Sequence, residues 1–122
     1  MTRNLTEEAI DEFSRGEETA EAQRKSGAYL VGVTEPGESP AEARDHLEEL
    51  RELVGTLGYP IAGETMVSIR APHAKYYLGS GKAEEVCGAA KEANAELLVF
   101  DTELGPSQQR NLERLARINV VD

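Results

Sequence analysis

Several features that define other classes of protein are scarce in this sequence. Its 122 residues include no tryptophan and a single cysteine, Cys87. One cysteine excludes an intramolecular disulfide and a cysteine-built zinc site, so we expect Cys87 to be a small core residue. No apolar run approaches the ~20 residues that span a bilayer, and the acidic N-terminus lacks the layout of a signal peptide. We therefore expect a cytoplasmic protein.

Positive charge is scarce as well, because 13 Lys and Arg face 23 Asp and Glu, for a net charge of −10. This balance argues against bulk attraction to nucleic acid, which needs clustered Lys and Arg. One stretch is an exception. Residues 65–83 contain Arg70, Lys75 and Lys82 and no acidic residue at all.

The length fits one domain with a polar extension. Residues 1–26 hold only Leu5, Ile10 and Phe13 as large apolar residues. This composition predicts a partly helical or disordered N-terminal arm over 1–26 and one folded domain over 27–122.

Hydrophobic patterning predicts alternating strands and helices in the folded domain. Apolar runs indicate strands at 28–33, within 59–69, at 97–100 and at 118–121. Helical spacing follows a Ser39–Glu42 capping box, and it recurs from Ala83 and after Gly105. In the last helix we expect Leu112, Leu115 and Ala116 to face inward and Gln108, Gln109, Arg110 and Arg114 to face solvent. The alternation predicts an α/β fold, with a mainly parallel sheet of about four strands and helices on both faces.

Ligands of such sheets gather at the carboxyl ends of the strands, where helix N-termini present free amides. Gly79, Ser80, Gly81 and Lys82 form a glycine-rich loop leading into a helix, which suits a phosphate of a nucleotide or of RNA. A tight helix-entry turn explains the same glycines. The loop is not a Walker A motif, because the first glycine is replaced by Tyr76 and no Ser or Thr follows the lysine.

The acid-free stretch places Arg70, Lys75, Tyr76 and Tyr77 close together. Basic and aromatic side chains in one loop can pair with phosphates and stack on unpaired bases, so these residues are candidates for RNA binding. An ordinary solvated loop with one tyrosine packed inward is the alternative.

Catalytic and metal chemistry have little support. Asp101 and Asp122 each follow a predicted strand and could share a divalent cation, although carboxylates that end strands by accepting backbone hydrogen bonds are the favoured interpretation. We assign no catalytic residue and no metal ligand.

The order of these segments resembles the N-terminal domain of HflX-type ribosome-associated GTPases. The matching pieces are LVGV at 30–33, SPAEARDHLEELRELVGTLGYPIAG at 39–63, YYLGSGKAEEV at 76–86 and AELLVFDTELGPSQQRNLERLARINVVD at 95–122. The last piece is the most specific. Gly105 stands where the family commonly has serine, which leaves capping of the following helix to other groups.

The resemblance implies an α/β domain that contacts rRNA of the large ribosomal subunit during rescue of stalled ribosomes, with Gly79–Lys82 as the contact loop. GTP and Mg²⁺ belong to the G domain of the parent family, and this chain has no GxxxxGK[ST], DxxG or NKxD motif. We therefore do not expect it to hydrolyse GTP. Two alternatives remain, namely an ATP-binding module and an acidic protein-interaction domain that self-associates through a sheet edge.

Overall fold

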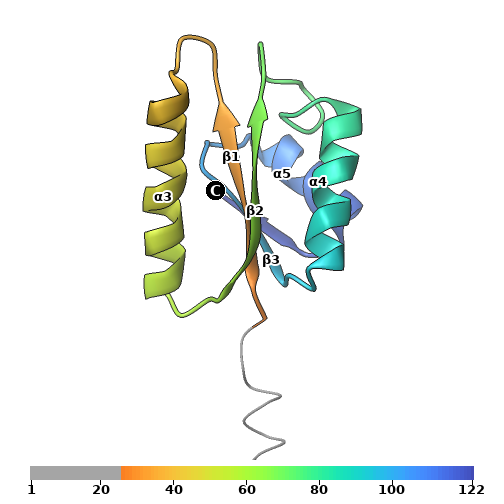
Figure 1. Cartoon of the computed structure of the whole chain (residues 1–122). Helices are drawn as coiled ribbons and strands as arrows, with labels where there is room; N and C mark the ends of the chain where they lie inside the picture. The colour runs from red at the N-terminus through yellow and green to blue at the C-terminus, as the bar shows by residue number, and fades with distance from the viewer. Residues whose placement is uncertain (1–25) are drawn as a thin grey trace, which may run out of the picture.

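Strands and helices alternate along the described part of the chain, residues 26–122 of the computed structural model (Figure 1). The elements are β1 (Ala28–Thr34), α3 (Pro40–Thr56), β2 (Ile61–Ser68), α4 (Ser80–Glu92), β3 (Leu97–Phe100), α5 (Pro106–Ala116) and β4 (Asn119–Val121). The predicted arm over 1–26 lies outside the described residues except for Ser26. No helix within 26–122 is long and apolar enough to cross a membrane.

The sheet confirms the predicted fold class. Its four strands within the described chain are ordered β2-β1-β3-β4, and every neighbouring pair is parallel. Helix α3 lies on one face, while α4 and α5 lie on the other (Figure 1). After β1 the chain crosses to β2 at one edge of the sheet, and after β3 it crosses to β4 at the other edge. The carboxyl ends of β1 and β3 therefore flank the switch point, where ligands of such sheets commonly bind.

Side chains alternate between two apolar layers because successive strand residues point to opposite faces. Tyr29 and Val31 pack in the layer toward α4 and α5, and Ala28 and Leu30 pack toward α3. Cys87 lies in the first layer at 3% exposure, as expected, and its burial raises the pKa of the thiol to about 11.

Helix α3 begins as its sequence predicts. The Oγ of Ser39 accepts a hydrogen bond from the Glu42 amide at 3.1 Å, and the Ser39 amide donates to Glu42 Oε1 at 3.0 Å. These two bonds satisfy amides that have no partner within the helix, and Leu47 and Val54 then anchor the helix on the sheet.

Candidate nucleic-acid interface

Helix α4 begins earlier than the sequence indicated. Gly79 is its N-cap and Ser80 its first residue, so the segment predicted as a loop before the helix is the cap and first turn of the helix itself. The first intrahelical bond runs from the Ala83 amide to the Gly79 carbonyl at 2.8 Å. Within residues 26–122, the amides of Ser80, Gly81 and Lys82 have no acceptor, and Gly79 supplies no side-chain cap. These three backbone amides therefore lie at the N-terminus of α4, where the helix dipole is positive.

The glycines of this first turn are not required by the fold. A Cβ on Gly81 would meet nothing within 4 Å, and one on Gly79 would lie 3.8 Å from the His73 ring, an ordinary contact. Glycine in an exposed helical turn costs roughly 0.5–1 kcal/mol relative to alanine. A close approach to the backbone by a ligand would account for glycine at Gly81, whereas glycine is an ordinary N-cap residue at Gly79.

The loop before α4 is docked on α5. His73 and Tyr77 exchange two backbone hydrogen bonds of 3.0 and 2.9 Å, which close a tight turn. The Nε2 of Gln108 donates to the His73 carbonyl at 2.7 Å, and Asn111 Nδ2 donates to the Lys75 carbonyl at 3.0 Å. Two side chains of α5 thus hold the loop beside the first turn of α4.

Gln108 and Gln109 are therefore placed differently from the expectation that they face solvent. Gln108 Oε1 also accepts from the Gly105 amide at 2.7 Å, which is the half of a capping box that does not need a side chain at the N-cap. Gln109 Nε2 donates to the Val120 carbonyl at 2.7 Å and ties α5 to β4. Both glutamines are partly buried.

The first turn of α4 and the segment before it contain three basic side chains. Arg70 and Lys75 are exposed, and neither has an ion-pair partner among the described residues. The Lys75 ammonium lies 5.3 Å from the centroid of the Tyr76 ring, a cation–π arrangement. Lys82 pairs with Glu85 at 3.1 Å on the exposed helix surface, where such pairs contribute little and exchange readily.

Tyr77 lies inside the core, unlike its neighbour. Its ring is 7% exposed, and its φ of 70° is a left-handed conformation that is uncommon for a residue other than glycine. The hydroxyl donates to the Glu35 carboxylate and lies 3.1 Å from Thr102 Oγ1. Burial, followed by the hydrogen bond to Glu35, raises the pKa of this phenol. Tyr77 thus joins the loops that follow β1 and β3 to the segment before α4.

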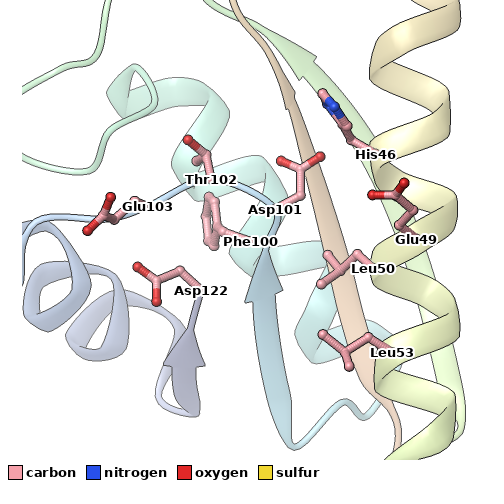
Figure 2. A pocket seen from close by; sticks show the side chains of 9 residues that line it. All are labelled: His46, Glu49, Leu50, Leu53, Phe100, Asp101, Thr102, Glu103 and Asp122. Atoms are coloured by element: carbon pink, nitrogen blue, oxygen red, sulfur yellow. The ribbon is translucent and has the colours of Figure 1, made fainter.

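The switch point between β1 and β3 is acidic. A groove of about 550 Å³ lies between α3 and the segments that follow β3 and β4, and its lining includes Glu49, Asp101, Glu103 and Asp122 (Figure 2). Burial raises the pKa of Asp101, although a hydrogen bond from the Val33 amide lowers it in part. This surface repels phosphate, whereas the first turn of α4 contains no acidic residue.

Asp101 and Asp122 follow the favoured interpretation of strand-ending carboxylates. Asp101 Oδ1 accepts the Val33 amide at 2.9 Å, and Asp122 Oδ2 accepts the Leu104 amide at 2.7 Å. The described residues contain no group of three or more His, Cys, Asp or Glu side chains arranged to hold a metal ion.

Comparison with known proteins decides the family. Residues 44–122 match the family described as GTP-binding GTPase N-terminal. The chain belongs to this family. Its relatives include the GTPase HflX of Akkermansia muciniphila, 43% identical over 95 residues that make up 78% of this chain and 22% of that protein. The GTPase HflX of Escherichia coli K12 is 41% identical over 78 residues, 64% of this chain and 18% of that protein.

The chain spans about a fifth of the length of these relatives, and it corresponds to the N-terminal domain of an HflX-type GTPase. The family match covers α4, α5 and the loop between β2 and α4, so it includes every residue of the candidate interface. The glutamine and asparagine of the family-like segment PSQQRN, Gln108 and Asn111, hold this loop. Sequence reasoning missed that role because their acceptors are backbone carbonyls, which no sequence pattern displays.

Proposed function

We propose that this HflX N-terminal domain docks on the large ribosomal subunit by binding rRNA phosphates with the first turn of α4 and the adjoining loop. GTP and Mg²⁺ act in the G domain of such proteins, and this chain contributes docking during rescue of stalled ribosomes in the cytoplasm. The observation that carries the proposal is the first turn of α4, where three amides have no acceptor within residues 26–122 and the Lys82 side chain is exposed.

The surroundings of this turn favour a polyanion. Arg70 and Lys75 are exposed on the segment before it, and residues 65–83 contain no carboxylate. Tyr76 is partly exposed under the Lys75 ammonium, where an unpaired base can stack. We assign Tyr77 to the interface as the residue that holds this loop in place, because its buried ring cannot stack on a base without leaving the core.

Co-sedimentation with purified large subunits across a salt series tests the proposal. Each lost phosphate contact should reduce the slope of log affinity against log salt by roughly 0.7–0.9. We expect this reduction for Lys82→Ala and for Lys75→Ala. Lys91→Ala is the matched control, because Lys91 is exposed in the last turn of the same helix. Unchanged slopes for both test variants, or an equal loss for the control, would rule the proposal out.

Nucleotide binding is the second candidate, and it rests on the same helix N-terminus. The cavity beside Lys82 measures about 190 Å³, below the ~300–1,000 Å³ of typical small-molecule sites. Thermal unfolding with millimolar ATP separates the two functions. Stabilisation by roughly 2.7 kcal/mol is expected for a ligand at a hundred times its dissociation constant. An unchanged unfolding temperature would remove the nucleotide candidate and leave RNA docking intact.

A further inference from the structure

Tyr76 is the partly exposed aromatic side chain of the segment before α4. Its ring packs against the apolar layer toward α4 and α5, whereas the neighbouring Tyr77 is buried within that layer. The Lys75 ammonium lies over the Tyr76 ring, 5.3 Å from its centroid. The ring is therefore supported by the core and covered by the side chain of an exposed lysine.

The backbone on either side of Tyr76 is fixed before any ligand arrives. The Lys75 carbonyl accepts a hydrogen bond from Asn111 Nδ2 at 3.0 Å, and the Tyr77 amide donates to the His73 carbonyl at 2.9 Å. The buried ring of Tyr77 anchors the next residue in the core. A ligand that contacts the Tyr76 ring therefore loses little affinity to ordering of the protein.

The Lys75 ammonium is a replaceable cover for the ring. A cation–π contact at an exposed site changes an equilibrium constant by a factor of roughly 2–5, whereas stacking of a base on an aromatic ring contributes a factor of roughly 5–150. A base can therefore displace the ammonium from the ring. The displaced ammonium stays on a surface where Arg70 is also exposed and where residues 65–83 contain no carboxylate. A phosphate beside the stacked base is the partner that fits it.

We propose that Tyr76 stacks on the base of one unpaired nucleotide, and that the Lys75 ammonium moves from the ring to a neighbouring phosphate. The surface thereby prefers RNA with a bulged or looped-out nucleotide to a continuous duplex, because a duplex hides the faces of its bases in the stack. This inference rests on the proposed RNA docking and adds to it the class of RNA that is bound. Phosphates are present in both kinds of RNA, so the first turn of α4 alone would not distinguish them.

Two RNA hairpins with the same number of phosphates test the preference. One carries a single 2-aminopurine as a bulge, and the other pairs the same base with uracil inside its stem. We expect the bulged hairpin to bind at least about fivefold more tightly, the lower end of a stacking contribution. Emission of the bulged 2-aminopurine should fall on binding, because stacking on the ring quenches this base. Equal affinities for the two hairpins would overturn the proposal.

Two variants of Tyr76 separate stacking from structure. Tyr76→Leu keeps an apolar side chain against the core and removes the aromatic face, so the preference for the bulged hairpin should fall below about twofold. Tyr76→Phe keeps the aromatic face and should retain both the preference and the quenching. Urea unfolding of each variant checks that the domain is folded. A preference that persists in Tyr76→Leu, or one that is lost equally in Tyr76→Phe, would overturn the proposal.

Two lysine variants distinguish failure of the stacking from failure of the docking. Lys75→Ala should reduce the slope of log affinity against log salt more for the bulged hairpin than for the paired one, because its ammonium leaves the ring only when a base covers it. Lys82→Ala should weaken binding of both hairpins equally. Equal affinity of the two hairpins together with this loss would refute the stacking and leave the docking intact. Binding of both hairpins that is independent of salt and of Lys82 would refute the docking as well.

Discussion

Removing the Tyr77 hydroxyl should destabilise the domain and loosen the candidate interface. Tyr77→Phe keeps the buried ring and removes one donor, which serves the Glu35 carboxylate and lies 3.1 Å from Thr102 Oγ1. Hydrogen bonds to charged groups contribute about 1.5–3 kcal/mol, and the exposed Glu35 recovers some solvation, so we expect a loss of about 1–2 kcal/mol. For a domain of this size the melting temperature should fall by roughly 4–8 °C for each kcal/mol lost.

Urea unfolding followed by circular dichroism measures this loss, and Tyr76→Phe is the matched control. The Tyr76 hydroxyl has no hydrogen-bond partner among residues 26–122, so its removal should change the free energy of unfolding by less than about 0.5 kcal/mol. A double-mutant cycle with Glu35→Gln should give a coupling energy of about 0.5 kcal/mol or more. The reasoning is refuted if Tyr77→Phe matches the wild type, or if the control loses as much stability.

Three further results are expected. Burial raises the pKa of Asp101, so the folded state holds the proton more tightly than the unfolded state. The contribution of this group to the free energy of unfolding is therefore complete below the ordinary pKa of 3.8, and it falls as the pH rises through the higher value. Asp101→Asn keeps an acceptor for the Val33 amide and should flatten that decline in urea titrations carried upward from pH 3.8; an unchanged decline would contradict the assignment. Cys87, with its pKa raised to about 11, should react with a thiol reagent only as fast as the domain opens, and rapid labelling of folded protein would disprove its burial. Leu112→Ala should cost about 2–5 kcal/mol because the side chain is fully buried, whereas Leu53→Ala should cost under about 1 kcal/mol, and equal losses would contradict the packing.

The fold was predictable because its signals are local. Ser39, Pro40 and Glu42 act within one helical turn, so their sequence spacing determines the start of α3 without reference to the rest of the chain. The start of α4 was placed late for the opposite reason. Gly81 has low helix propensity, and the helix begins before it because Ala83 and Val86 are anchored in the core.

The candidate site was only partly predictable. The absence of carboxylates from residues 65–83 marks the basic loop as a local exception to the overall charge, and its role in binding stays a prediction. The support beneath that loop depends on contacts between distant positions, such as Tyr77 with Glu35 and Gln108 with the His73 carbonyl, 42 and 35 residues apart. Periodicity and capping rules describe neighbours in sequence, so they cannot indicate that these groups meet.

The opposed charges of the two surfaces lead to one more prediction, which rests on the proposed RNA docking. Lowering salt strengthens phosphate contacts at Lys82 and Lys75, but it also extends the reach of the carboxylates in the groove between α3 and the segments that follow β3 and β4. The screening length grows from about 8 Å at 0.15 M salt to about 30 Å at 0.01 M, more than twice the ~13 Å radius of gyration of such a domain.

Repulsion from the groove should therefore oppose RNA binding only at low salt. We expect the plot of log affinity against log salt to be linear near physiological salt and to flatten toward about 0.01 M. The reversal Glu49→Lys with Glu103→Lys should restore linearity without changing the slope near physiological salt, because neither residue lies in the candidate interface. A plot for the wild type that stays linear throughout would show that the groove carboxylates do not reach the bound RNA, and the two surfaces would then act independently.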